Sequence, residues 1–340
     1  MLNDFDYEIE DKFIAQIPLK RRDESKLLIF NGEQFRHRNF HEINHELKEN
    51  TLIIMNNSKV IPAKFQGNKI TQGGGEVKVT LTREIKVNQW ECIVEGRHLK
   101  EGIIIKFKPG NFEGKLIKWI KEGIYIIEIN EKIPIRELMK QFGEIPLPHY
   151  IRMRPPDISR YQTIYASKEG SIAAPTAGLH FTPKVIKKLK KKKIELEFIT
   201  LHVGLGSILP LRNKDLTKQT GYPEYYEISE ETSLKINEWK KKQEDILVVG
   251  TTCLKALESA ADKNGAIKPK SEISDLFIHP QYSFKFKFNK FLTNFHLPKA
   301  PPFILTGSLI GLERLKIIYQ EAQKNNYRFY SFGDSMLVFL

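Results

Sequence analysis

The amino-acid sequence predicts an α/β main domain, a layered sheet with flanking helices, with an inserted all-β antiparallel barrel domain. Two observations support this prediction. Helical and strand-like patterns alternate before residue 62 and after residue 147, whereas the residues between them contain only short β-rich runs with Gly and Asn breaks. We therefore expect residues 1–61 and 148–340 to form one discontinuous domain, and residues 62–147 to form a small barrel.

The elements of the main domain follow from local patterns. Residues 41–50 have a helical pattern, and the apolar run Thr51–Met55 indicates a buried strand. Thr182 and Pro183 start a helix, because Thr is a preferred N-cap and Pro suits the first helical position. We then expect, in chain order, a strand at 196–203, a helix at 229–242, a strand at 246–249, a helix at 252–261, a strand at 282–289 and a helix at 314–324.

The inserted domain is defined by strands at short, regular spacing. The β-rich runs are residues 76–85, 89–96, 103–108, 112–120 and 124–129. Five or six such strands are typical of a small antiparallel barrel or sandwich.

A formal net charge of +13 favours a nucleic-acid partner, because Lys and Arg side chains neutralise phosphates. The densest basic run, Lys187–Lys193, continues a predicted helix. Such runs are usually solvated faces, so RNA contact is the alternative interpretation. The candidate RNA-binding residues are Lys187, Lys188, Lys190 and Lys191.

Cysteine usage and hydropathy indicate a cytoplasmic protein. Only Cys92 and Cys253 are present, without a disulfide framework or metal-ligand spacing. No apolar run approaches the ~20 residues that a bilayer-spanning helix needs. The acidic and aromatic start of the chain is unlike a signal peptide. We expect no membrane association.

The segment Gly170–Thr182 is the strongest candidate for a binding site, with a structural turn as the alternative. Its small residues let backbone approach a ligand closely, while His180 offers a proton-handling nitrogen. His202, where a predicted strand meets a Gly-x-Gly loop, and His296 lie at similar element boundaries. Because loops converge at strand ends in α/β sheets, we expect the three histidines to share one site.

Three other polar segments could complete this site, although each could also be an ordinary turn or cap. They are Gly250–Cys253 with Glu258 in the next helix, Asn56–Pro62, and Gly333-Asp334. No metal is expected, because nothing resembles HExxH or paired cysteines. His37, His41 and His45 recur every four residues, where a helix face is the favoured interpretation and metal binding the alternative.

Many segments, spread almost end to end, match one known family in the same order. They are Phe5–Tyr7, Arg22–Leu28, Asn57–Ala63, Gly143–Pro148, Tyr161–Thr163, Ala173–Thr182, Thr200–Gly204, Gly250–Thr252, Leu257–Ser259, Thr293–Lys299, Tyr327–Phe329 and Gly333-Asp334. On these segments the chain resembles the S-adenosylmethionine:tRNA ribosyltransferase-isomerases of queuosine biosynthesis, the QueA family.

The resemblance implies an α/β domain with an inserted barrel, and it implies a reaction. The ribosyl part of S-adenosylmethionine is transferred to 7-aminomethyl-7-deazaguanine in a tRNA anticodon and isomerised, giving epoxyqueuosine-tRNA, adenine and methionine. S-adenosylmethionine is then a consumed co-substrate, and no other cofactor is expected. The expected partners are tRNA and this co-substrate, for a monomeric chain.

The implied chemistry needs a base and an acid. We expect His180, His202 and His296 to supply them, with Asp334 or Glu258 orienting one of the three. The remaining candidates are substrate-binding residues taken from the matching segments. They are Arg22, Asp23, Asn57, Ser58, Pro175, Thr176, Gly178, Gly204, Glu224, Thr251, Thr252 and Asn294.

The chain departs from the family pattern at several places, most clearly in one motif. Where the family has His-x-Met-His-x-Glu, this chain has Gln219–Glu224, which keeps only the final Glu224. Lys255 stands where the family has Arg, which removes a planar bidentate donor. The alternative function is therefore a non-catalytic or repurposed RNA-binding paralogue of the same fold.

Overall fold

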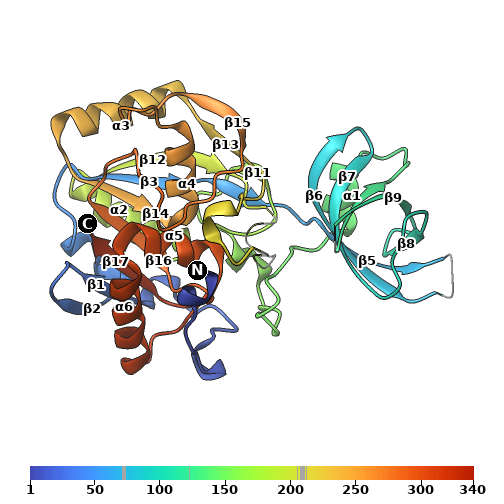
Figure 1. The fold of residues 1–340 in the computed structure, drawn as a ribbon, viewed down its shortest axis with the longest axis horizontal. Coiled ribbons are helices and arrows are strands. Elements are labelled where there is room, and N and C mark those ends of the chain that lie inside the picture. The colour runs from blue at the N-terminus through green and yellow to red at the C-terminus, as the bar shows by residue number, and fades with distance from the viewer. Residues whose placement is uncertain (71–73, 122, 205, 207–210, 212) are drawn as a thin grey trace. The chain divides into compact units, whose positions relative to one another are not determined.

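The computed structural model describes residues 1–70, 74–121, 123–204, 206, 211 and 213–340. The chain forms two compact units, Met1–Lys59 with Pro148–Leu340, and Val60–Leu147 (Figure 1). The first unit contains a nine-stranded sheet and the second a closed antiparallel barrel. The predicted fold class is confirmed.

Strand order across the nine-stranded sheet differs from chain order. Across the sheet the strands are β15 (Lys270–Ser274), β13 (Glu224–Ile228), β12 (Glu195–Leu201), β3 (Leu52–Asn56), β14 (Ile246–Val249), β16 (Lys290–Asn294), β17 (Ser335–Phe339), β1 (Lys26–Phe30) and β2 (Phe35–Asn39). β12, β3, β14 and β16 are parallel, whereas β17 is antiparallel to β16 and β1 is parallel to β17. The four parallel strands therefore end at the edge where β17 and β1 begin, which we call the carboxyl edge. A separate two-stranded sheet pairs β4 (Ser58–Val60) with β11 (Lys168–Ser171).

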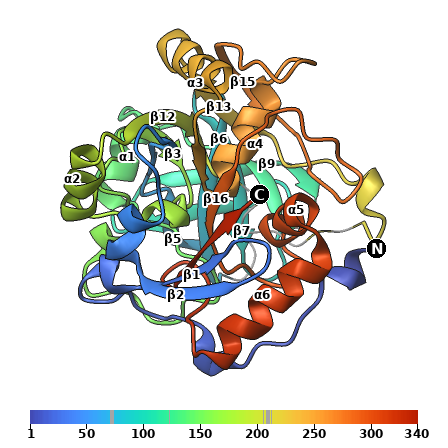
Figure 2. The ribbon, with the colours of Figure 1, turned by 90° about the vertical axis from the view of Figure 1, so that its left-hand side faces the viewer.

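Helices cover both faces of the large sheet (Figure 2). One face carries α2 (Pro183–Lys191) and the 3₁₀ helix η4 (Phe40–His45), and the other carries α3 (Glu230–Lys242), α4 (Gly250–Ala260), α5 (Pro301–Ile310) and α6 (Leu312–Lys324). Strand β3 serves both layers because successive side chains point to opposite faces. Ile53 and Met55 join the core with α2, while Leu52 and Ile54 join the core with α4. This double burial explains why the strand is continuously apolar.

Side-chain caps start two of the predicted helices. The Thr182 hydroxyl accepts a hydrogen bond from the Val185 amide at 3.3 Å and donates one to the Asp23 carboxylate at 2.9 Å. Ser229 accepts the Thr232 amide at 3.2 Å and starts α3. Such caps satisfy amide donors that have no partner inside the helix. The expected helices at these positions are confirmed.

The strand expected at residues 282–289 is wrong, since β16 begins only at Lys290. This segment instead runs across the fully buried carboxylate of Glu258. That carboxylate accepts hydrogen bonds from the Tyr282 hydroxyl at 2.9 Å and from the amides of Lys285 and Phe286 at 3.0 Å. Amides that a sheet would use are therefore bound to a side chain, and the alternating aromatic pattern does not reflect a strand.

The second unit is a closed barrel of six strands. In order around the barrel they are β10 (Ile124–Glu128), β7 (Gln89–Glu95), β6 (Glu76–Lys86), β5 (Lys64–Lys69), β8 (Ile104–Lys108) and β9 (Glu113–Lys121), and the helix α1 (Ile135–Phe142) follows them in the chain. Phe65, Phe107 and Phe112 pack together with ring centroids 4.7–5.5 Å apart. β5 was not predicted, because Lys64–Lys69 is mostly polar. It fits through Gly67, where a Cβ atom would lie 2.6 Å from the Lys106 carbonyl oxygen.

Candidate active site

Polar residues gather at the carboxyl edge of the sheet from six strands. The residues at or next to these strand ends are Asn56, His202, Gly250, Asn294, Ser25 and Asp334. Asn56 and Asn294 are the last residues of β3 and β16, and His202 and Gly250 directly follow β12 and β14, so all four lie at the ends of parallel strands. Asp334 instead precedes β17 and reaches the same edge only because β17 is antiparallel to β16.

A cavity with an empty volume of about 770 Å³, partly open to solvent, lies at this edge. We call it the central cavity. Its wall combines the predicted small-residue segment with the start of α4 and the loop after β16. The lining residues include Ala173, Ala174, Pro175, Thr176, Ala177, Thr251, Thr252, Asn294, His296, Tyr150, Tyr161, Tyr330 and Ser331.

Three residues of this wall, Thr252, Asn294 and His296, each leave one buried polar atom without a hydrogen-bond partner among the described residues; in Thr252 it is the hydroxyl oxygen. Asn294 donates through Nδ2 to the carbonyl oxygens of Tyr330 at 3.1 Å and Asp334 at 3.3 Å, which fixes the amide orientation, and its Oδ1 is unpaired. His296 contacts the Thr293 hydroxyl through Nε2 at 3.1 Å, and its Nδ1 is unpaired. Buried polar atoms almost always have partners, so these three atoms in one wall favour the central cavity as a ligand site.

His296 is held as a neutral imidazole. Burial lowers its pKa to about 3, since the interior disfavours the charged form. Its backbone amide donates to the Tyr319 hydroxyl at 2.7 Å, and its carbonyl oxygen accepts the Tyr7 hydroxyl. At neutral pH this side chain can accept a proton or donate one N–H, but it carries no charge.

His180 is buried beside the central cavity. Its Nδ1 contacts the Ser25 hydroxyl at 2.7 Å, its Nε2 contacts the Asn294 amide nitrogen at 3.3 Å, and its ring stacks on Phe40. Burial lowers its pKa to about 3, and Arg328 lowers it further. It reaches the central cavity through Asn294.

His202 occupies a different place along the same edge. Its Nδ1 contacts the Ser58 hydroxyl at 3.1 Å, and its ring stacks on Tyr225 with centroids 5.4 Å apart. A Cβ atom at Gly170 would lie 2.6 Å from its Nε2. It is not among the residues that line the central cavity. Of the three predicted histidines, only His296 lines that cavity directly.

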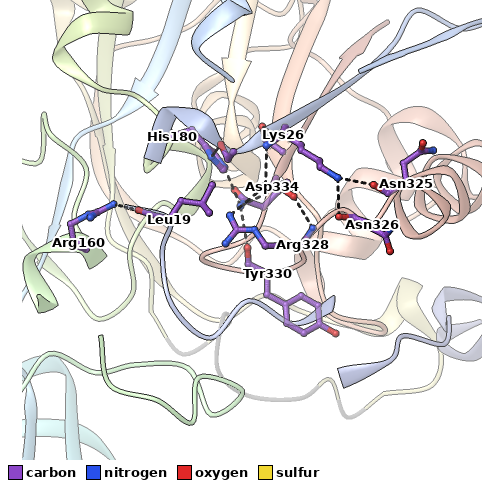
Figure 3. A network of polar contacts seen from close by, with 12 residues as sticks. Leu19, Lys26, Arg160, His180, Asn325, Asn326, Arg328, Tyr330 and Asp334 are labelled. Carbon is purple, nitrogen blue, oxygen red and sulfur yellow. Dashed lines mark hydrogen bonds and ion pairs between the residues drawn. The ribbon is translucent and has the colours of Figure 1, made fainter. Parts of the chain in front are cut away.

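The two predicted carboxylates contact other partners than histidine. Asp334 accepts the amides of Lys26 at 3.0 Å and Arg328 at 2.7 Å, and the Arg328 guanidinium lies 3.4 Å away (Figure 3). Burial raises the pKa of Asp334, against the opposing effect of Arg328. Glu258 lies inside α4, and its described hydrogen bonds go to residues 282–286. Asp334 is thus linked to His180 only through its backbone contact with Asn294.

A second cavity adjoins the first, with which it shares Val203, Thr251, Thr252 and Pro302. Its empty volume is about 660 Å³, and Glu224 and Lys255 line it as an ion pair at 2.8 Å. The other oxygen of Glu224 accepts the Gly204 amide at 2.8 Å. Lys255 therefore supplies a cation to this carboxylate, although it lacks the planar bidentate donor of an arginine.

The divergent motif at Gln219–Glu224 fits its surroundings. A Cβ atom at Gly221 would lie 2.6 Å from the Leu276 carbonyl oxygen, so the backbone path leaves no room for a longer side chain. Tyr222, which stands in place of a family histidine, lines the second cavity.

The other predicted substrate-binding residues are divided between walls and supports. Pro175, Thr176, Thr251 and Thr252 line the central cavity, and Arg22 lines a third pocket described below. Four others contact protein groups and support the walls. Gly178 packs against the Tyr165 hydroxyl, and Asp23 accepts a hydrogen bond from Thr182. Asn57 accepts the Thr200 hydroxyl at 2.7 Å, and Ser58 contacts His202.

The basic run lies away from the cavities. α2 ends where β12 begins, so Lys190 and Lys191 lie near the sheet edge opposite to the carboxyl edge. Lys188 donates to the His41 carbonyl oxygen at 3.0 Å and helps to hold η4. The side chains of Lys187, Lys190 and Lys191 are exposed.

The recurring histidines do not share one helix face, so that interpretation is wrong. His37 lies in β2, where it contacts the Tyr327 hydroxyl at 2.8 Å, while His41 and His45 lie in η4. Within the described ranges, no cluster of three His, Cys, Asp or Glu residues could hold a metal ion. In the same part of the chain no helix is long and apolar enough to cross a membrane.

Three tyrosines of the central cavity and two arginines of the third pocket were not predicted from the sequence. Tyr150, Tyr161 and Tyr330 line the central cavity, and Arg160 and Arg328 line the third pocket. Tyr161 and Arg328 lie within matching segments, which was the available signal. For a tyrosine or an arginine, a single sequence does not tell whether the side chain faces the protein interior or a ligand.

The fold and the site define a class of protein. A sheet covered on both faces, with strand-end loops around a cavity of apolar and unpaired polar groups, is typical of enzymes that bind small ligands in α/β domains. The chain belongs to the queuosine biosynthesis protein family, whose model matches residues 2–338.

Individual relatives agree with this assignment. The chain is 39% identical to the S-adenosylmethionine:tRNA ribosyltransferase-isomerase of Desulforamulus reducens over 340 residues, with 99% of each chain covered. Identity to the protein of the same name from Carboxydothermus hydrogenoformans is also 39%, again with 99% of each chain covered. The crystal structure of S-adenosylmethionine tRNA ribosyltransferase from Thermotoga maritima is similar, with a TM-score of 0.55, 28% identity and coverage of 98% and 99% of the two chains.

Proposed function

We propose that this chain is an S-adenosylmethionine:tRNA ribosyltransferase-isomerase. It transfers and isomerises the ribosyl moiety of S-adenosylmethionine onto 7-aminomethyl-7-deazaguanine in tRNA anticodons, giving epoxyqueuosine-tRNA, adenine and methionine. S-adenosylmethionine is a consumed co-substrate, and no further cofactor takes part. The observation that carries the proposal is the central cavity, in which Asn294 and His296 each present an unpaired buried atom.

The neutral state of His296 supports a role as the base. The sulfonium of the co-substrate acidifies the adjacent C5′ hydrogens, so a positioned base can take one of these protons and leave an ylide. If Nε2 of His296 carries its proton and donates to Thr293, the lone pair of Nδ1 is the acceptor in the cavity. Asn294 Oδ1 accepts a hydrogen bond from the substrate, since an amide oxygen can only accept.

Departing adenine needs a proton, and the proton taken from C5′ can be returned by the same imidazolium. His180 and Asp334 support this step by positioning Asn294. His180 contacts the Asn294 amide nitrogen, and the backbone carbonyl oxygen of Asp334 accepts a hydrogen bond from it. We propose that His202 and Glu258 stabilise the surrounding structure and do not contact the substrate.

The proposed partner is tRNA, for a monomeric cytoplasmic enzyme. The exposed lysines of α2 are proposed as a contact for parts of the tRNA remote from the anticodon. Replacing Lys187, Lys190 and Lys191 by Glu should lower the slope of log affinity against log salt. An unchanged slope would show that α2 does not contact RNA.

One assay tests the proposed reaction. The protein is incubated with S-adenosylmethionine and with tRNA that carries the aminomethyl-deazaguanine base, and the small products are separated. Release of adenine and methionine in equal amounts is expected. S-adenosylhomocysteine would instead indicate a methyltransferase and overturn the proposal.

The divergent Gln219–Glu224 motif favours one other candidate function, a non-catalytic RNA-binding paralogue. Retained tRNA affinity without any product would support it. A Tyr222→His variant that gains turnover under the same conditions would identify the motif as the cause.

A further inference from the structure

A third pocket, which we call the arginine pocket, lies beside the central cavity. Three arginines line it, namely Arg22, Arg160 and Arg328, together with Ser25, His180 and Ser331. Its volume is about 290 Å³, which includes space open to solvent. The three guanidinium groups come from separate parts of the chain, the first before β1, the second from the 3₁₀ helix Ile158–Tyr161 and the third before β17.

Each guanidinium is held in place by hydrogen bonds, and each still has N–H donors that these bonds do not use. Arg22 donates to the Gln162 carbonyl oxygen at 3.0 Å, and Arg160 donates to the carbonyl oxygens of Leu19 at 2.7 Å and Lys20 at 3.3 Å. Arg328 contacts Asp334 at 3.4 Å (Figure 3). Because a guanidinium has five N–H donors, these bonds leave most of the donors of the three arginines for another acceptor.

The charges of the pocket are not balanced. Asp334 is the ion-pair partner of Arg328, and Asp157 acts on Arg22 from an exposed position. The pKa of the Arg22 guanidinium is lowered by burial and by repulsion from Arg160, which outweigh the effect of Asp157. A bound anion would relieve this repulsion and accept the remaining N–H groups.

The arginine pocket is joined to the central cavity. Ser331 lines both, and the contact between His180 and Asn294 connects their walls. A base in the central cavity and a phosphate group at the arginines can therefore belong to one nucleotide or to two adjacent ones. Phosphate contacts of this kind fix the register of a nucleic acid without reading its sequence.

We propose that the arginine pocket binds a backbone phosphate of the tRNA next to the nucleotide whose base occupies the central cavity. This inference rests on the proposed function, because it needs a tRNA nucleotide as the occupant of the cavity. Enzymes that act on a base in nucleic acid turn it out of its stack, which requires the flanking backbone to be held. Arg22 and Arg160 bind the phosphate group of that backbone, while Arg328 keeps its ion pair with Asp334.

The test combines a protein variant with a chemically changed RNA. Arg22→Gln removes one charge, and an anticodon stem–loop with a methylphosphonate at one flanking position removes one phosphate charge. In the wild-type protein the methylphosphonate at the 5′ or the 3′ flank should weaken binding about tenfold. Arg22→Gln should weaken binding of the unmodified stem–loop similarly and lower the salt slope by about 0.7. The two changes together should cost little more than either alone.

The control removes a charge elsewhere. Lys241→Gln changes an exposed residue in the last turn of α3 and should leave the effect of the methylphosphonate unchanged. The wild-type arm with the two methylphosphonate stem–loops needs no variant, so it remains informative if Arg22→Gln fails to fold.

Three outcomes would overturn the inference. The first is a full additive loss of affinity in the combined experiment, and the second is no loss of affinity with a methylphosphonate at either flank. The third is a weaker affinity for S-adenosylmethionine in Arg22→Gln with unchanged RNA binding, which would assign the pocket to the methionine carboxylate. Wild-type protein that releases no adenine would refute the proposed function instead, and that result is independent of these binding measurements.

Discussion

The wall of the central cavity and the interior beneath α4 both contain buried polar side chains, and they differ in how completely these are bonded. Under α4, Glu258 is fully buried, and three donors converge on its two oxygens. In the cavity wall, Asn294 and His296 each keep one unpaired atom. The difference distinguishes a buried carboxylate whose hydrogen bonds are made within the fold from the wall residues that we propose contact a ligand.

The largest expected effect is on stability at Glu258. Glu258→Ala should lower the free energy of unfolding by roughly 4 kcal/mol, because the Tyr282 hydroxyl and two amides would lose their acceptor in the interior. Urea unfolding followed by circular dichroism measures this loss. Glu258→Gln, which keeps an acceptor oxygen, should cost less. A stable Glu258→Ala protein without turnover would instead place Glu258 in catalysis and remove the distinction drawn above.

The next effect concerns His296. His296→Ala should slow adenine release by about 10²-fold, as expected for loss of a general base. Its free energy of unfolding should fall by about 1 kcal/mol, because the contact between Nε2 and the Thr293 hydroxyl is lost while Nδ1 has no partner to lose. His45→Ala, an exposed change in η4, serves as the control. Equal rates in the two variants would contradict the assignment, and single-turnover kinetics would detect this.

His180 should make stability depend on pH. Its pKa is about 3 in the folded chain and about 6.5 when unfolded, so the unfolded state binds one more proton between these values. Stability from this group is present above pH 6.5 and is lost as pH falls, by about 1.4 kcal/mol per pH unit. His180→Gln should reduce the slope of unfolding free energy between pH 6 and pH 4 by this amount. An unchanged slope would mean that His180 is protonated in the fold.

The smallest effect is expected at Lys255, a cavity residue whose charge is already paired. Lys255→Arg should change kcat/KM less than threefold, because an arginine can also pair with Glu224. Lys255→Met should be more damaging, since it leaves a buried carboxylate without its partner. Steady-state assays of both variants would show whether the charge or the planar donor matters.

Several of these elements could be predicted from local patterns. The buried strand at Thr51–Met55, the capped start of α2 and the loop around His296 each carry a signal within a few residues. Other elements carry none. Helix α5 is apolar on all sides and starts with two prolines, so it has no helical periodicity to detect. Residues 282–289 alternate like a strand, but the amides of Lys285 and Phe286 donate to the buried Glu258 carboxylate instead of to a neighbouring strand.

The site shows the same limit. His296 and Asn294 could be named because they sit in one short segment at a strand end. Whether His202 shares their cavity depends on the Gly170 contact and on Tyr225, which are remote in the chain. The arginine pocket combines three distant segments, so no sequence window contains it.

The position of β17 has a consequence for how the chain is made. It is the last strand in sequence order, yet it lies between β16 and β1, where Leu27 pairs with Ser335. Until β17 leaves the ribosome, β1 and β2 have no place beside β16, and the hydrophobic edge of β16 stays open. The sheet of the main unit therefore stays incomplete until β17 pairs with β16, and until then its open edge could pair with other chains. Removal of β17 would therefore separate β1 and β2 from the rest of the sheet and leave β16 as an edge strand.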